Sequence, residues 1–179
     1  LPVPDKTLFL SVPLEFIKKN LSETRTGDDR DYLNGKDPKD VETEIALASN
    51  AGIDVFLYDY YWYNGEKTQE EAIEKGFLKA KNRDKMKFAL MWCYHERRDS
   101  FRPPYSKERR ELMSLAHTPE EFLGLIDYSI AHYFNQPEYY RKDGKLFFSI
   151  YRFTSLWETW GKDDAKVRNA ILEAKRRVR

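Results

Sequence analysis

Four short apolar runs alternate with four amphipathic segments along this chain, and this alternation constrains the fold more than any other feature. Strands are expected at residues 7–12, 53–57, 87–92 and 146–151. Helices are expected at residues 38–51, 68–80, 118–133 and 163–178. Strands that alternate with helices in this way are typical of a parallel sheet covered by helices.

Local signals mark where several of these elements begin and end. Asp37 precedes Pro38 at the start of one helix, as an N-cap with proline in the first turn. Thr68 with Glu71 and Thr118 with Glu121 have the spacing of capping boxes. Asn64-Gly65 and Asp143-Gly144 are expected to be turns. Residues 18–36 and 97–117 are polar and are expected to be loops.

The expected fold class is α/β, a (β/α)8 TIM-type barrel of which residues 1–179 supply the first four βα units as one domain. A complete barrel needs eight units and about 250 residues, whereas this chain has 179. The alternative is a self-contained, four-stranded, doubly wound domain, but the chain has no glycine-rich phosphate-binding motif. A half-barrel would leave strand edges unpaired, so self-association is expected, and a stable monomer would contradict this interpretation.

Charge and composition exclude several classes of function. The formal net charge is +1, from 31 basic and 30 acidic residues, so no nucleic-acid partner is expected. No apolar run reaches the roughly 18 residues of a membrane-spanning helix. The single cysteine, Cys93, excludes an internal disulfide and leaves the compartment open, with a periplasmic or extracellular location preferred.

An aromatic and acidic cluster, Asp59-Tyr60-Tyr61-Trp62-Tyr63, follows the apolar strand at residues 53–57. Ligands of parallel α/β proteins bind beyond the carboxyl ends of the strands, which is where this cluster is expected to lie. Aromatic rings beside a carboxylate indicate a sugar subsite. Tyr61, Trp62 and Tyr63 are therefore predicted to bind substrate, although packing of the rings in the core is the alternative.

The strand at residues 87–92 ends in a second group of candidate residues, Trp92, His95 and Glu96. Glycoside cleavage generally needs two carboxyl groups beside the glycosidic bond, and Asp59 and Glu96 are predicted as the catalytic acids. Trp92, His95 and Tyr151 are predicted to bind substrate. The alternatives are a salt bridge for Asp59, a solvated loop position for Glu96, packing for Trp92 and a structural hydrogen bond for His95.

The segment His95-Glu96-Arg97-Arg98-Asp99 resembles a zinc-protease helix, but aspartate stands where the second histidine is needed. His117 and His132 have no evident partners in the sequence. No metal site and no cofactor are therefore expected.

Three blocks of the sequence resemble one known family, at residues 51–63, 76–92 and 137–151. The first holds Gly52-Ile53-Asp54 followed by Asp59 and Tyr61-Trp62-Tyr63. The blocks are similar, in order and spacing, to the glycoside hydrolase family 99-like domain, also described as the WbsX type of glycosyltransferase. The resemblance is strongest over residues 37–179.

This resemblance implies a (β/α)8 barrel and a polysaccharide as partner, because members include endo-acting α-mannoside hydrolases and proteins of polysaccharide biosynthesis. The expected function is a glycoside hydrolase acting on a polysaccharide or an α-mannoside-like glycan. A glycosyltransferase that uses a nucleotide-sugar or lipid-linked donor is one alternative. A non-catalytic glycan-binding module is another.

The chain departs from the family pattern at three places. Tyr94 and Arg97 stand where the family usually has asparagine and tryptophan, and Arg152 stands where aspartate is common. The family's late segment, with two glutamates near a tryptophan, has no counterpart in residues 1–179. The resemblance therefore implies that the main acid and base lie outside this chain.

Overall fold

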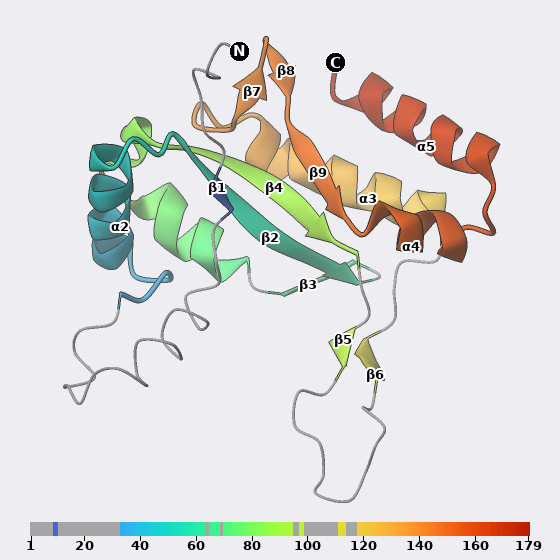
Figure 1. Ribbon diagram of the computed structural model, residues 1–179, viewed down its shortest axis with the longest axis horizontal. Coiled ribbons are helices and arrows are strands. Elements are labelled where there is room, and N and C mark those ends of the chain that lie inside the picture. Colours follow the sequence, from blue (N-terminus) through green and yellow to red (C-terminus); the bar gives the residue numbers. More distant parts are fainter. Residues whose placement is uncertain are drawn as a thin grey trace, which may run out of the picture. The chain divides into compact units, whose positions relative to one another are not determined.

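The computed structural model describes Phe9–Leu10 and residues 33–63, 65–68, 70–94, 97–98, 111–113 and 118–179. These residues form an α/β fold around a sheet with the strand order β1-β2-β4-β9 (Figure 1). β1 pairs with β2 in parallel, with Phe9 opposite Phe56. The strands are β1 Phe9–Leu10, β2 Val55–Tyr63, β4 Lys87–Cys93 and β9 Phe148–Tyr151. All four predicted strands are therefore present, in sequence order across the sheet.

The helix predicted after Asp37 is confirmed as α2, Pro38–Asn50. The Asp37 carboxylate accepts a hydrogen bond of 2.8 Å from the Lys39 backbone amide, which satisfies one of the free amides of the first turn. Val41 and Ile45, which lie one turn apart, are buried. The apolar spacing seen in the sequence therefore gives the buried side of this helix.

The predicted start of the second helix is wrong. Thr68 lies in a short strand, β3 Glu66–Thr68, which pairs antiparallel with the end of β2 after a turn at Gly65. No side chain caps the helical segment that follows. That segment consists of a π-helix, η2 Ala72–Gly76, and a 3₁₀ turn, η3 Phe77–Lys79, followed by a second 3₁₀ turn, η4 Arg83–Lys85.

The capping box at Thr118 and Glu121 is confirmed at the start of α3, Pro119–Ser129. The Thr118 hydroxyl accepts from the Glu121 amide at 3.2 Å, and the Glu121 carboxylate accepts from the Thr118 amide at 3.1 Å. A π-helix, η5 Ile130–Phe134, continues α3. No helix of the described residues is long and apolar enough to cross a membrane.

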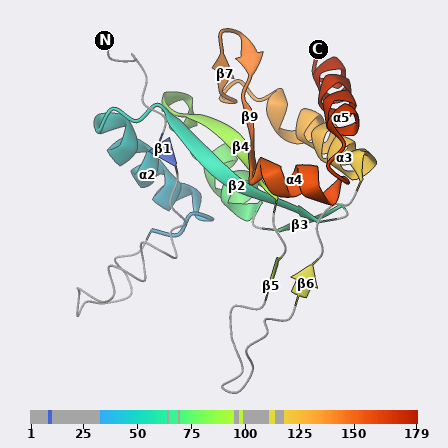
Figure 2. The same ribbon diagram turned by 45° about the vertical axis from the view of Figure 1, so that its right-hand side comes forward.

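The last predicted helix is confirmed as α5, Asp164–Arg177, which is capped by Asp163. It lies beside α3 in both views (Figures 1 and 2), and Arg177 donates to the Asp127 carboxylate at 2.5 Å. A shorter helix, α4 Phe153–Thr159, precedes it and was not expected from the sequence.

The predicted strand at 146–151 is divided in two. Its first residues belong to a hairpin of β7 Arg141–Lys142 and β8 Lys145–Leu146, and only β9 joins the main sheet. The predicted turn is confirmed, because Asp143 and Gly144 both have positive φ, as a type I′ turn needs.

The long segments predicted as loops are described only in part. Within residues 97–117, β5 Arg97–Arg98 pairs antiparallel with β6 Glu111–Met113, so this segment is not entirely a loop. The other residues of that segment lie outside the described part of the chain. The same holds for residues 18–32 and for the predicted first strand apart from Phe9–Leu10.

The chain divides into two compact units, each with its own aromatic core. One unit comprises residues 1–59, 69–90 and 137–147, and its core includes Phe77 and Phe88, whose ring centroids lie 5.1 Å apart. The other comprises residues 60–68, 91–136 and 148–179, where Trp92 packs on Phe122. β2 and β4 contribute residues to both units.

Glu71 is expected to make stability depend on pH. Its carboxylate accepts hydrogen bonds from Lys36, at 2.5 Å, and from Lys75, and these lower the pKa of Glu71 from 4.5 to about 2. Because the folded-state pKa is depressed, the stabilisation is present above about pH 4.5 and is lost as the pH falls toward 2. The measurement is the urea midpoint of wild type and Glu71→Gln at several pH values. The difference should shrink at low pH and in high salt, and a constant difference would contradict this account.

Candidate functional site

The predicted aromatic cluster lies inside a strand and not beyond its end. Residues 59–63 are the last five residues of β2, which runs from Val55 to Tyr63. Successive side chains of a strand point to opposite faces, so the cluster is divided between the two faces of the sheet. The prediction that these residues lie beyond the end of the strand is therefore wrong.

One face of β2 is covered by helical segments. Tyr58 contacts Phe77 of η3 with ring centroids 6.1 Å apart, and Tyr60 contacts Tyr133 of η5 at 5.7 Å. Trp62 follows on the same face and is only 9% exposed. Its ring lies 5.4 Å from that of Tyr128 in α3. Trp62 therefore packs between the sheet and a helix.

Trp92 lies in a similar environment near the end of β4. Its ring stacks on Phe122 of α3, with centroids 5.6 Å apart and an interplanar angle of 20°. The side chain is 1% exposed. Packing, the alternative that the sequence left open for both tryptophans, is what this arrangement shows. The proposed site therefore does not depend on Trp62 or Trp92.

The opposite face of β2 carries Asp59, Tyr61 and Tyr63, which we call the tyrosine face. The Tyr61 and Tyr63 rings stack, with centroids 6.4 Å apart and an interplanar angle of 22°. Asp59 and Tyr61 are half-buried, and Tyr63 is buried. The face thus places a carboxylate two residues before a pair of stacked phenol rings, along one strand.

Side chains also alternate between the two sides of β4 and β9, and this identifies the neighbours of the tyrosine face. Cys93 follows Trp92 and so points away from α3, and its thiol is buried. Phe148 contacts Phe134 of η5 at 6.2 Å, so Tyr151, three residues later, points to the other side. Tyr151 is 48% exposed. Cys93 was not among the predicted site residues, although it directly follows Trp92 and the alternation of side chains along a strand places it on this side.

The remaining candidates, His95 and Glu96, lie outside the described residues. The separation between the two predicted carboxylates, Asp59 and Glu96, therefore stays a prediction. Within the described ranges, no group of three His, Cys, Asp or Glu side chains is placed to hold a metal ion.

A protein-family model matches this chain, which tests the family resemblance seen in the three sequence blocks. Residues 20–168 match the model of the family described as Glycosyltransferase WbsX. The chain belongs to this WbsX family. The match includes Asp59 and the tyrosine face, and it confirms the resemblance to a carbohydrate-active family. No curated protein shows significant similarity to the chain.

Solved structures with a related backbone include two of the GH99 endo-α-mannosidase from Bacteroides thetaiotaomicron. One, in complex with bis-tris-propane, has a TM-score of 0.46 at 17% identity and covers 68% of this chain. The other has a TM-score of 0.47 at 16% identity and covers 71%. In both comparisons the WbsX-family chain spans 31% of the length of the mannosidase chain.

Proposed function

We propose that the tyrosine face is part of the glycan-binding site of a glycoside hydrolase that acts on a polysaccharide or an α-mannoside-like glycan. The observation that carries this proposal is the placement of Asp59, Tyr61 and Tyr63 on one face at the carboxyl end of β2. This end of parallel strands is where α/β barrels bind their substrates. Membership of the WbsX family supports a carbohydrate ligand.

Each residue has a distinct proposed role. The Asp59 carboxylate accepts hydrogen bonds from sugar hydroxyls, and the rings of Tyr61 and Tyr151 contact the C–H faces of the sugar. Tyr63 is only 3% exposed and stacks on Tyr61, so its proposed role is to hold the Tyr61 ring in place. His95 and Glu96, which follow β4, complete the subsite. Glu96 supplies the second carboxylate near the glycosidic bond, while the main acid and base come from residues outside positions 1–179.

Removing single groups from the tyrosine face should weaken glycan binding. Asp59→Asn removes a charged acceptor, and the expected loss of affinity is about 10- to 100-fold. Tyr61→Phe removes only a hydroxyl, so its effect should be smaller. The measurements are calorimetric binding and release of reducing ends from α-mannan and other polysaccharides by the full-length protein.

Tyr58→Phe is the matched control, because Tyr58 lies on the same strand but on the helix-covered face. It contacts Phe77 and Phe88, and burial raises the pKa of its hydroxyl. Removing that hydroxyl should leave glycan binding unchanged. The proposal fails if Tyr58→Phe weakens binding as much as Tyr61→Phe, or if Asp59→Asn binds like wild type.

A glycosyltransferase is the second candidate, and the description of the matched family favours it. A transferase would form product only when a nucleotide-sugar or lipid-linked donor is present, whereas a hydrolase needs only the polysaccharide and water. Binding without turnover under either condition would identify a non-catalytic glycan-binding module. The same assay, run with and without donors, therefore separates the three candidates.

We also propose that β1, β2, β4 and β9 are consecutive strands of a (β/α)8 barrel. Their sequence order across the sheet and the intervening helical segments support this proposal. The remaining strands would come from outside residues 1–179. An experimental structure of the natural gene product in its native oligomeric form should show a further parallel strand beside β9. A sheet that ends at β9 would contradict the proposal.

A further inference from the structure

Arg152, which follows the last residue of β9, has an unusual backbone conformation. Its φ of 59° and ψ of 50° lie in the left-handed region, which is uncommon for arginine. Asp143 and Lys162 also have positive φ, but each is next to a glycine with positive φ. Arg152 instead lies between Tyr151 and Phe153. A glycine-containing turn therefore does not account for the conformation of Arg152.

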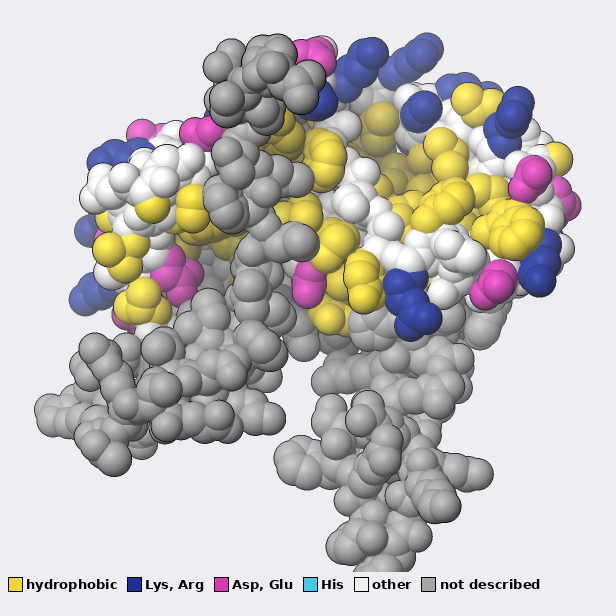
Figure 3. Space-filling model, viewed as in Figure 1, with side chains coloured by type: hydrophobic (Ala, Val, Ile, Leu, Met, Phe, Trp, Pro, Cys, Tyr) yellow, Lys and Arg dark blue, Asp and Glu magenta, His cyan; other side chains and the backbone are white. Residues whose placement is uncertain are grey.

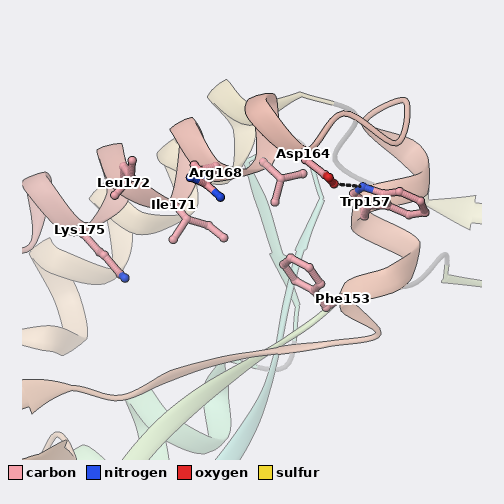
Figure 4. A pocket seen from close by; sticks show the side chains of 8 residues that line it. Phe153, Trp157, Asp164, Arg168, Ile171, Leu172 and Lys175 are labelled. Carbon is pink, nitrogen blue, oxygen red and sulfur yellow. Dashed lines mark hydrogen bonds between the residues drawn. The ribbon is translucent and has the colours of Figure 1, made fainter.

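Contacts between α4 and α5 hold the helix that follows Arg152. The Trp157 indole of α4 donates a 2.8 Å hydrogen bond to the Asp164 carboxylate at the start of α5 (Figure 4). The Ile171 side chain of α5 projects toward the ring of Phe153, the first residue of α4 (Figure 4). These contacts fix the direction in which the chain leaves β9. Residues that the surrounding structure keeps in an unfavourable conformation are concentrated at active sites and binding sites.

The Arg152 side chain is exposed, and its charge is not neutralised within the described part of the chain. Arg83, Arg176 and Arg177 form salt bridges, whereas no described acidic side chain lies within salt-bridge distance of Arg152. On the face seen in Figure 3, basic atoms lie where β9 meets α4 in Figure 1, among hydrophobic and uncharged side chains. The guanidinium is therefore free to bind an anion.

Arg152 lies at the end of the sheet where we propose that glycan binds. The arrowheads of β2, β4 and β9 all point toward this end (Figure 1). Tyr151, directly before Arg152, points to the side of the tyrosine face and is 48% exposed. The sequence that follows β4 is also basic, because residues 97–117 contain six basic and three acidic residues. An aromatic ring and an arginine are thus adjacent at the carboxyl end of β9.

The chemistry of these two side chains favours an anionic sugar. A guanidinium has a planar fork of donors that matches two oxygens of a carboxylate or a sulfate ester. A phenol ring next to it covers the C–H face of a sugar. A neutral sugar over Arg152 would remove water from the guanidinium without supplying an opposite charge, which is unfavourable.

We propose that Arg152 binds an anionic group of the glycan, a carboxylate or a sulfate ester, so that the ligand of this site is an acidic polysaccharide. Tyr151 contacts the ring of the sugar that carries this group. The inference rests on the proposed glycan-binding site, because Arg152 determines which glycan that site prefers.

The test compares charged and uncharged forms of the same polysaccharide. The probes are α-mannan and amylose, each unmodified, oxidised to carboxylates at C6, or sulfated. In calorimetry with the full-length protein, one acidic form should bind about 10- to 100-fold more tightly than the unmodified form. The form that is preferred distinguishes a carboxylate from a sulfate. Arg152→Gln should abolish the preference, and Arg152→Lys should keep only part of it, because lysine has the charge but not the fork.

Arg168→Gln is the matched control. Arg168 is also exposed and has no described salt bridge, but it lies on α5. This variant removes the same charge and should leave the preference for the acidic form unchanged. Equal losses in Arg152→Gln and Arg168→Gln would show a general attraction of a polyanion and would overturn the proposal.

Two further results would overturn the proposal. The first is equal binding of acidic and unmodified forms by the wild type. The second is an Arg152→Gln variant with a lower urea midpoint, whose binding falls only in proportion to the folded fraction, because Arg152 would then have a structural role. If Asp59→Asn weakens binding but Arg152→Gln does not, the glycan site stands and only the anionic ligand is wrong. If no form of either polysaccharide binds, both proposals fail.

Discussion

Replacing Gly76 with alanine is expected to destabilise the protein by about 1–3 kcal/mol, the usual cost of forcing extra volume into a packed site. A Cβ atom at Gly76 would lie 2.1 Å from the carbonyl oxygen of Gly35 and 3.0 Å from Cγ2 of Val41. The nearest atom belongs to the backbone, so a side-chain rotation cannot relieve the overlap. The residue 33–37 segment would have to move away from η2. The measurement is the unfolding free energy from urea titration.

Gly124→Ala is the matched control for this substitution. Gly124 lies inside α3, and a Cβ atom there would have no neighbour within 4 Å. Alanine restricts the unfolded chain more than glycine does, so this variant should gain about 0.5–1 kcal/mol. If Gly76→Ala is as stable as wild type, the close approach of Gly35 to Gly76 is wrong.

The parts of the fold that depend on neighbouring residues could be predicted from the sequence. Asp37 and Thr118 cap helices through hydrogen bonds to amides two or three residues away, so the signal and the structure lie in the same short segment. The turn at Asp143 and Gly144 is local in the same sense. Long-range packing is not needed to specify any of these features.

The errors arose where distant residues compete with a local preference. Thr68 and Glu71 have the spacing of a capping box, but Thr68 pairs with Tyr61 in a hairpin, and the helical segment that follows has no side-chain cap. Gly76, which has the close contact with Gly35, lies in a π-helix where the sequence predicted a regular α-helix. The missed helix α4 begins after Arg152, whose positive φ is uncommon for arginine, and no side chain caps it.

The candidate site shows the same division between local and long-range information. Composition identified the stretch from Asp59 to Tyr63, because carboxylate and aromatic residues are concentrated there. Composition could not divide the stretch between two faces, since that depends on β2 continuing to Tyr63 and on which helices cover it. The partners of Trp62 and Trp92 are in α3, about 30 to 65 positions away in the sequence.

Trp92→Ala is expected to cost about 3–5 kcal/mol of stability, because it deletes a large, fully buried ring and leaves a cavity beside Phe122. Trp92→Phe should lose much less, since an aromatic ring can still stack on Phe122. Tyr61→Ala, on the tyrosine face, is the contrasting variant and should reduce glycan binding more than stability.

Urea unfolding and glycan-binding calorimetry on the same three variants separate the two roles that the sequence allowed for Trp92. If Trp92 is a packing residue, its truncation lowers the stability of the protein, and any loss of glycan binding should follow the loss of folded protein. A sugar-stacking residue shows the reverse: the variant keeps full stability but binds glycan more weakly, by about 0.5–1.5 kcal/mol for one aromatic contact. If Trp92→Ala is folded, stable and unable to bind glycan, the face of the sheet that binds sugar is the one we assign to packing. The tyrosine face would then have to be abandoned as the site.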